Sequence, residues 1–160
     1  IFQSINLIPD LTSFENIAYP AYLVMPKKGA NEKAEQLLRQ FGLWDQRDKY
    51  PHEMSGGQQQ RVAIIRAIAA EPTILFADEP TGALNSSSGT QVFDQLTGLN
   101  EAGQTIIMVT HDIKACARGN RLLYLADGRI DGDLELGFYH PDEQQQREEK
   151  IFQFLKAHHW

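Results

Sequence analysis

The sequence has 160 residues, a formal net charge of −6 and a pI of about 5.3. This length fits one domain with a real core, and the acidic balance excludes binding to nucleic acid or anionic lipid through a generally basic face. The single cysteine, Cys116, permits no intramolecular disulfide, and every apolar run is shorter than the roughly 18 residues that predict a membrane-spanning helix.

Residues 12–54 are predicted to be mainly helical. Ser13 can cap a helix that Pro20 interrupts or kinks, and Asn31 can cap a second helix that runs to Phe41 and stops at a glycine. Several apolar residues in and before this region could form an exposed groove, although burial in the core is the more common state of such side chains. They are Leu7, Ile8, Leu11, Tyr19, Tyr22 and Leu23.

The segment Ser55-Gly56-Gly57-Gln58 precedes a predicted helix over residues 62–70. Ser55 and Gln58 have the spacing of a capping box, in which the serine hydroxyl accepts a hydrogen bond from a free helix amide. That interpretation leaves Gly56 and Gly57 unexplained, because each glycine costs a helix roughly 1 kcal/mol relative to alanine. Glycine lets a ligand approach the backbone, and amides at a helix N-terminus attract anions. Capping, the more common case, and phosphate contact are therefore both open.

Two apolar runs, Ile74 to Ala77 and Ile106 to Val109, are typical of strands buried on both faces of a parallel sheet. A predicted helix from Gly89 to Asn100 separates them, as in α/β folds. Ligands of parallel sheets lie at the carboxyl ends of the strands, where Asp78 and Glu79 follow the first run. There Asp78 could hold Mg²⁺ and Glu79 could orient or deprotonate an attacking water. A solvated turn with a helix cap is the alternative.

His111 follows the second run, at the carboxyl end of that strand. A lone histidine is usually a surface residue or a hydrogen-bonded core residue. Its position beside a second carboxyl end of the same sheet favours a role near Asp78 and Glu79 instead.

The C-terminal part of the chain is predicted to contain a hairpin and a helix. Residues 122–125 and 129–133 flank an Asp-Gly turn, and this hairpin is expected to close the edge of the sheet. Residues 142–159 predict a charged amphipathic helix that packs on the core or, alternatively, contacts a partner. The expected apolar stripe of this helix comprises Ile151, Phe152 and Leu155.

Five short segments match known motifs in a fixed order. Ser55 to Gln58 matches a signature sequence, and Ile74 to Glu79 matches a Walker B strand. Gln3 is similar to a Q-loop glutamine, Asn85 lies in the position of a D-loop, and His111 is similar to a switch histidine. Nearly the whole chain, up to about residue 137, therefore resembles the nucleotide-binding subunits of ABC transporters.

Within that family, two segments indicate a subgroup. Asn6 to Pro9 and Asp78 to Leu84 are most similar to the branch that releases lipoproteins or exports macrolides and antimicrobial peptides. The usual D-loop aspartate is replaced by Asn85, so the charge that it would bring to a dimer interface is absent.

The resemblance implies an α/β fold, the C-terminal part of a P-loop NTPase with a helical subdomain and a mainly parallel core sheet. The expected parts are a Q-loop segment at 1–11, the helical subdomain at 12–54, the remaining motifs of the ATPase core at 55–137, and a helical tail at 138–160.

The resemblance also implies roles for single residues. Glu79 and His111 are expected to be catalytic, with His111 contacting the γ-phosphate. Asp78 and Gln3 are the expected Mg²⁺ ligands. The residues expected to bind nucleotide are Gln3, Ser55, Gly56, Gly57, Gln58 and Asn85.

A P-loop has the pattern G-x-x-x-x-G-K-S/T, and no lysine of this chain follows a glycine. The resemblance therefore implies that the chain begins at the Q-loop and lacks Walker A. In the family, two subunits arranged head to tail close over ATP, and P-loop amides and lysine cradle the phosphates. Hydrolysis by this chain alone is expected to be absent.

The function implied by the resemblance is that of an ATP-binding and ATP-hydrolysing subunit of a membrane exporter or lipoprotein-release system, with ATP and Mg²⁺ as cofactors. The expected partners are transmembrane permease subunits and a second ATP-binding subunit, without nucleic acid. The expected location is cytoplasmic, on the inner face of the cell membrane through the permease, which agrees with the lone cysteine and the lack of a secretory signal. A soluble ABC-type ATPase or a noncatalytic ABC-like subunit is the alternative.

Overall fold

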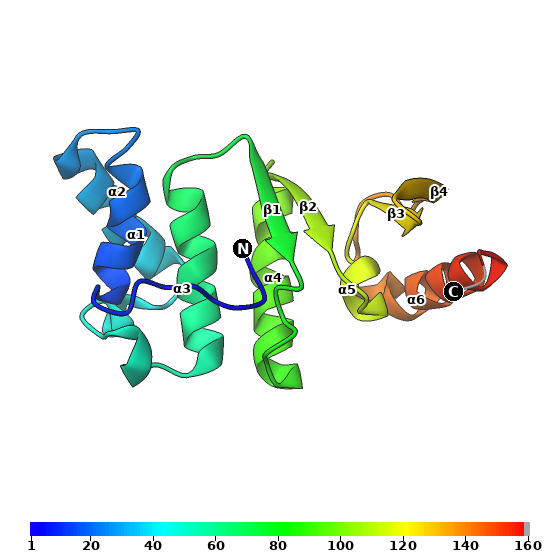
Figure 1. Cartoon of the computed structure of the whole chain (residues 1–160), viewed down its shortest axis with the longest axis horizontal. Coiled ribbons are helices and arrows are strands. Elements are labelled where there is room, and N and C mark those ends of the chain that lie inside the picture. The colour runs from blue at the N-terminus through cyan, green and yellow to red at the C-terminus, as the bar shows by residue number, and fades with distance from the viewer. Residues whose placement is uncertain (159–160) are drawn as a thin grey trace. The chain divides into compact units, whose positions relative to one another are not determined.

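The computed structural model describes residues 1–158 and divides into two units, Ile1–Val109 and Thr110–Trp160. The first contains α1 (Ser13–Ala21), α2 (Lys27–Gln40), η1 (Trp44–Gln46), η2 (Pro51–Glu53), α3 (Gly56–Ala69), β1 (Ile74–Asp78), α4 (Ser86–Glu101) and β2 (Thr105–Val109) (Figure 1). The second contains α5 (Ile113–Cys116), β3 (Arg121–Ala126), β4 (Arg129–Glu135), η3 (Pro141–Glu143) and α6 (Gln144–Ala157). None of the helices within residues 1–158 has the length and apolar character needed to cross a membrane.

Helix α3 lies at the centre of the core of the first unit. Its four consecutive residues 62–65, which point in different directions around the helix axis, are all buried. It packs against α1 and α2 as well as α4. Complete burial of one isoleucine contributes about 1.5–3 kcal/mol, so Ile64 and Ile65 anchor α3 firmly. The same core includes Ile17, Leu38, Leu75 and Val92 from four other elements.

The starts of the first two helices differ from the prediction. Thr12, and not Ser13, caps α1, because Thr12 forms a complete capping box with Glu15. Ser13 is buried, and its hydroxyl donates to the carbonyl oxygen of Lys49 at 3.3 Å. Helix α2 begins at Lys27 and not at Asn31, because Pro26 already has the backbone conformation of a helix entry.

The predicted stop of α2 is confirmed. Gly42 has a φ of +63°, its N–H donates to the carbonyl of Arg39, and the N–H of Leu43 donates to the carbonyl of Leu38 at 2.8 Å. These two bonds form a Schellman motif, in which glycine adopts the left-handed conformation without strain.

Strands β1 and β2 pair in parallel, from Ile74 beside Thr105 to Asp78 beside Val109, as the α/β pattern predicts. The prediction that both faces are buried is wrong. Leu75 and Ala77 lie in the core, whereas Phe76 and Val109 are each 63% exposed. The reason is that the described part of the first unit covers one face of the sheet, the face that packs with α3 and α4.

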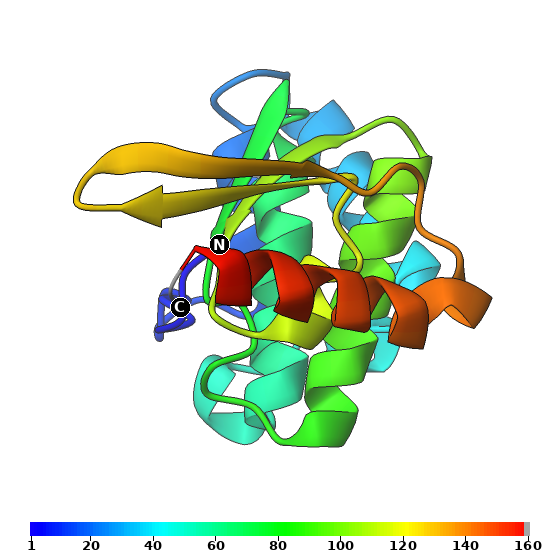
Figure 2. The ribbon, with the colours of Figure 1, turned by 90° about the vertical axis from the view of Figure 1, so that its right-hand side faces the viewer.

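The predicted hairpin in the second unit is confirmed. Strands β3 and β4 are antiparallel and meet in a turn at Asp127 and Gly128, which both have positive φ, as a tight hairpin turn requires. Within residues 1–158 the hairpin forms a two-stranded sheet of its own in the second unit, and the expectation that it closes the edge of the β1–β2 sheet stays a prediction. Leu122 and Tyr124 pack on the cluster that contains Ile151 and Leu155 of α6. The hairpin and α6 lie side by side (Figures 1 and 2).

Helix α6 also packs within the second unit. Ile151 and Leu155 are buried as predicted, but Phe152 is 47% exposed and Phe154 takes its place on the packed face. Spacings of three and four residues from Ile151 explain this choice, because residues so spaced lie on one helix face. Residues 159 and 160 lie outside the described part of the chain.

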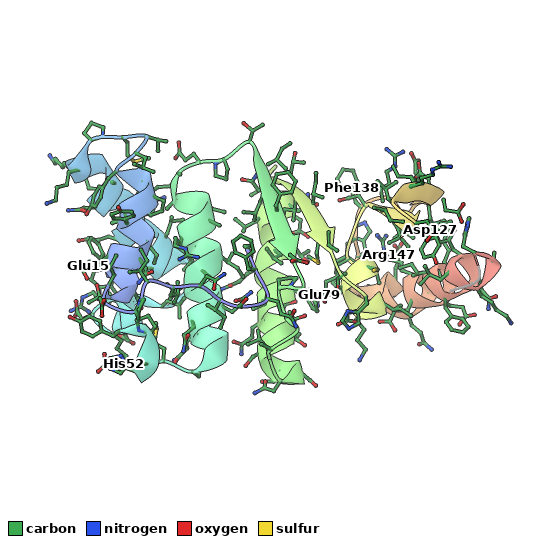
Figure 3. All side chains as sticks on the ribbon, in the orientation of Figure 1. Glu15, His52, Glu79, Asp127, Phe138 and Arg147 are labelled. Carbon is green, nitrogen blue, oxygen red and sulfur yellow. The ribbon has the colours of Figure 1, made fainter. Side chains whose placement is uncertain are left out.

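Arg147 of α6 is 4% exposed and ties the second unit together (Figure 3). Its guanidinium donates to five backbone carbonyl oxygens at 2.6–3.1 Å. The acceptors belong to Ala117, Gly119, Leu136, Gly137 and Phe138. Charge-assisted bonds of this kind are stronger than neutral ones, so a single side chain fixes two loops against the helix.

Candidate functional site

The candidate site begins where β1 ends. Asp78 is exposed at the last position of the strand, and Glu79 follows it half-buried (Figure 3). The N–H of Glu79 donates to the carbonyl of Val109 at 2.9 Å, and its own carbonyl accepts from the N–H of Gly82. Glu79 has a φ of +43°, a conformation that a non-glycine residue adopts only at a cost. The backbone therefore holds Glu79 in a strained turn at the carboxyl end of the sheet.

The N-terminal segment lies beside this turn. The N–H of Asp78 donates to the carbonyl of Ile1 at 2.9 Å, so the segment runs along the strand. A Cβ atom added at Gly82 would stand 2.7 Å from Nε2 of Gln3 and 3.2 Å from its Cδ. Gln3 is therefore packed directly on the turn that follows Glu79, and a larger residue at position 82 would displace its side chain. The structure brings Gln3, Asp78 and Glu79 to one edge of the sheet.

Two buried or half-buried side chains fix the rest of the segment 1–11. Asn16 is fully buried, accepts from the N–H of Ile8 at 2.8 Å and donates to the carbonyl of Leu11 at 2.9 Å. Arg66 of α3 donates to the carbonyl of Asn6 at 2.6 Å, and partial burial lowers the pKa of its guanidinium. The segment that carries Gln3 is thus fastened to both α1 and α3.

Gln60 is a site residue that the sequence did not single out. It is 1% exposed, and its Nε2 donates to the carbonyl of Pro80 at 2.7 Å and to that of Phe2 at 3.4 Å. The signal that could have found it is helical spacing, because residue 60 lies one turn before the buried Ile64. A glutamine on the buried face of a helix must find a partner there.

Ser55 forms the predicted capping box at the start of α3. Its hydroxyl accepts from the N–H of Gln58 at 3.3 Å, and Oε1 of Gln58 accepts from the N–H of Ser55 at 2.9 Å. The capping interpretation is confirmed. Contact of these residues with phosphate stays a prediction.

The two glycines of the signature segment have different surroundings. A Cβ at Gly57 would stand 2.7 Å from Oγ and 2.9 Å from Cβ of Ser88, so glycine is needed where α3 meets the first turn of α4. A Cβ at Gly56 would be 3.7 Å from the nearest atom, a methyl carbon of Leu84, which is ordinary contact. Packing therefore explains Gly57 and leaves Gly56 unexplained.

Asn85 caps α4. Its side-chain oxygen accepts from the N–H of Ser88 at 2.9 Å, and asparagine serves as an N-cap as well as aspartate does. Because Ser88 is also the neighbour of Gly57, the N-termini of α3 and α4 lie side by side. The structure thus brings the signature segment and Asn85 together.

His111 belongs to the second unit, where it is exposed and precedes Asp112, the N-cap of α5. Along the chain it is two residues from Val109, the β2 residue that pairs with Asp78. Its catalytic role stays a prediction.

The donor atoms at the sheet edge fit Mg²⁺ in kind. Asp78 offers a carboxylate and Gln3 an amide oxygen, and hard cations prefer oxygen ligands. Within residues 1–158 no group of three or more His, Cys, Asp or Glu side chains could hold a metal. Mg²⁺ in nucleotide sites is held by one or two carboxylates together with phosphate oxygens, so this sparse donor set suits an ion that binds together with a nucleotide.

Comparison with known proteins gives consistent matches. The family described as "ABC transporter" matches residues 1–82. The lipoprotein-releasing system ATP-binding protein LolD of Aquifex aeolicus is 46% identical over 84% of this chain and 60% of its own length. The macrolide export ATP-binding/permease protein MacB of Aggregatibacter actinomycetemcomitans is 49% identical over 84% of this chain and 21% of its own length. The chain thus spans three-fifths or less of these relatives.

A solved structure agrees with these relatives. The dimeric ATP-binding cassette MJ0796, in a post-hydrolysis state bound to ADP and Pi, superposes with a TM-score of 0.72 at 39% identity. The match covers 86% of this chain and 63% of that one. The fold is therefore that of an ATP-binding cassette, as the sequence predicts.

Proposed function

This chain belongs to the ABC transporter family, and from that premise we propose that it is part of the ATP-binding and ATP-hydrolysing subunit of an exporter-type membrane transporter. The observation that carries the proposal is the edge of the β1–β2 sheet, where Asp78 ends β1, Glu79 begins a hydrogen-bonded turn and Gln3 packs on that turn. Relatives named for lipoprotein release and macrolide export support the exporter class.

The residues at the sheet edge have different proposed roles in ATP hydrolysis. Mg-ATP, when bound, would supply the phosphoanhydride bond that hydrolysis breaks, and its Mg²⁺ ion would neutralise part of the phosphate charge. Asp78 and Gln3 present oxygen atoms to the ion, and Glu79 holds and deprotonates a water molecule. The strained backbone of Glu79 suits this role, because strain of this kind is concentrated at functional sites. We assign contact with the γ-phosphate to His111.

The N-terminus of α3 forms the second half of the proposed site. Ser55 and Gly56 are exposed at the positive end of a helix whose axis is anchored in the core, which suits contact with phosphate. We assign Ser55, Gly56, Gly57, Gln58 and Asn85 to the nucleotide bound by a second ATP-binding subunit. A dimeric cassette among the solved structures supports this arrangement.

Each segment of the chain has a proposed part in the transporter, and the permease gives the subunit its proposed location. We assign 1–11 as the Q-loop segment, 12–54 as the helical subdomain, 55–137 as the motif-bearing part of the ATPase core and 138–160 as the tail. Transmembrane permease subunits would contact the helical subdomain, where Tyr19, Leu23 and Val24 are 57%, 81% and 59% exposed. The permease would hold the subunit at the cytoplasmic face of the membrane.

The 160 residues contain no P-loop, so we propose that they do not hydrolyse ATP by themselves. Asp78 and Glu79 lack, within this sequence, the amides and lysine that stabilise transferred phosphate in related enzymes.

The test compares ATP turnover and nucleotide affinity for the 160-residue chain and for a chain extended upstream by a P-loop segment. We expect ATP turnover and tight Mg-ATP binding in the extended chain and neither of them in the 160-residue chain. Extraction with detergent separates the alternatives, because a transporter subunit remains with its permease and a soluble ATPase does not. Turnover by the 160 residues themselves would overturn the account of the nucleotide site.

A further inference from the structure

One buried side chain connects three parts of the proposed site. Gln60 lies on α3, the helix whose N-terminus carries the signature segment. One of its partners, the carbonyl of Pro80, directly follows Glu79, and the other, the carbonyl of Phe2, directly precedes Gln3. All of these residues belong to the first unit.

The contact requires a hydrogen-bond donor at this position. Both partners are carbonyl oxygens, which only accept hydrogen bonds, so the NH₂ group of Gln60 must face them. A carboxylate of the same shape would meet the two carbonyls with no proton to donate. An apolar side chain would leave the carbonyl of Pro80, at a buried contact, without this donor.

Packing alone does not account for a glutamine here. Oε1 of Gln60 is buried and has no hydrogen-bond partner within residues 1–158, which is unfavourable for stability. A methionine of similar length would fill the same space without that penalty, since buried unbranched apolar side chains adapt to such sites. Compared with methionine, glutamine contributes the two hydrogen bonds from Nε2 to the carbonyls of Pro80 and Phe2.

We infer that Gln60 is a positioning residue for ATP hydrolysis: it sets Glu79 and Gln3 against the signature helix by holding the backbone beside each of them. This inference rests on the proposed function. Gln60 is buried and bonds to backbone carbonyls, so its role is indirect. It acts through the turn after β1, whose strained backbone needs support from its surroundings.

The first test measures amide hydrogen exchange in the 160-residue chain and needs no nucleotide. In Gln60→Met, the amides of Asp78 and Gly82, which bond to the carbonyls of Ile1 and Glu79, should exchange at least about tenfold faster. Amides in α1 and α2 should be unchanged. The matched control is Gln59→Met, which removes a bond from the neighbouring glutamine to the carbonyl of Met54. Equal exchange in Gln60→Met and wild type would overturn the inference.

The second test measures kinetics in the chain extended by a P-loop segment. Gln60→Met should lower kcat by about tenfold or more with KM within about twofold, because it disturbs the reacting geometry and not nucleotide binding. Gln60→Glu should behave in the same way, since a carboxylate cannot donate to the two carbonyls, and it serves if Gln60→Met does not fold. A change in KM alone, or wild-type kcat in both variants, would overturn the inference. Absence of turnover in the unmutated extended chain would instead count against the proposed function. The exchange test would still decide whether Gln60 holds the backbone of the turn after β1.

Discussion

The two units of the chain are held together by different kinds of interaction. The first unit has a continuous apolar core around α3, with Ile17, Leu38 and Leu75 drawn from three other elements. The second has a small apolar cluster of Ala117, Ile151 and Leu155, and relies on the guanidinium of Arg147 to hold its loops. Small units bury too little apolar surface to be stable by that means alone. The proposed nucleotide site therefore rests on a large apolar core, to which buried polar side chains such as Gln60 add backbone contacts. The second unit has a much smaller core and depends more heavily on Arg147.

The largest expected effect comes from removing that polar residue. Arg147→Met should destabilise the second unit by roughly 3 kcal/mol or more, because five carbonyl oxygens lose charge-assisted hydrogen bonds. Limited proteolysis should then cut within residues 110–158 first. Arg129→Met, at an exposed position, is the control. Equal resistance in the two variants would contradict the role assigned to Arg147.

A smaller effect is expected where α3 meets α4 in the first unit. Gly57→Ala should cost about 1–3 kcal/mol in the free energy of unfolding, because the new methyl group would overlap Ser88. Urea unfolding of the single and double variants measures the coupling between the two positions.

Substitutions at Ser88, the residue that the new methyl group would meet, test the same contact from the other helix. Ser88→Gly should relieve the clash, whereas Ser88→Ala should not, since the Cβ of residue 88 itself lies 2.9 Å from the added atom. Relief by both, or by neither, would show that the two helices do not meet as described.

Gly56 is the contrasting position. Gly56→Ala should leave stability unchanged or raise it by up to about 1 kcal/mol, because the site has room and alanine is the better helix former. If Gly56 serves phosphate contact, the same variant in an extended chain should lose turnover while remaining stable. Thermal unfolding and ATP turnover measured on one preparation separate these effects. A clear loss of stability in Gly56→Ala would show that packing explains both glycines.

The smallest expected effect concerns pH and the second unit. Nε of Arg121 donates to Oδ1 of Asp133 at 2.8 Å, and this bond holds the pKa of the aspartate below its ordinary value. Since the pKa is lower in the folded state, the stabilisation is present above the ordinary pKa of aspartate and is lost as pH falls through the folded value. The urea midpoint of Asp133→Asn should therefore fall less than that of wild type between neutral and acid pH. Parallel curves for the two proteins would contradict this.

The sequence predicts much of the fold because its local signals agree with its packing. The Ser55–Gln58 capping box, the glycine stop at Gly42 and the Asp-Gly hairpin turn are each decided by a few adjacent residues. Burial of the strands was predicted wrongly, because an apolar run such as Ile74 to Ala77 does not reveal which of its faces is covered.

The candidate site was predicted less completely than the fold. Asp78 and Glu79 follow from the strand that precedes them. Gln60 and Arg147 lie in polar or charged runs, where helical spacing indicates the burial of Gln60 but not its partners. Gln60 bonds to carbonyl groups 20 and 58 residues away along the chain, and Arg147 bonds to carbonyl groups 9 to 30 residues away. Only the folded structure brings these groups together. Gly57 is similar, because the clash that excludes a side chain comes from Ser88.

Glu79 is the carboxylate that we propose to activate water in an ATP-hydrolysing site. The most direct measurement compares Glu79→Gln with the unmutated protein, both extended by a P-loop segment, for Mg-ATP affinity and phosphate release. The account predicts similar affinity and a loss of turnover of at least about 100-fold, because the amide keeps the shape of the side chain and cannot accept a proton. Turnover that persists in Glu79→Gln, with affinity unchanged, would contradict it.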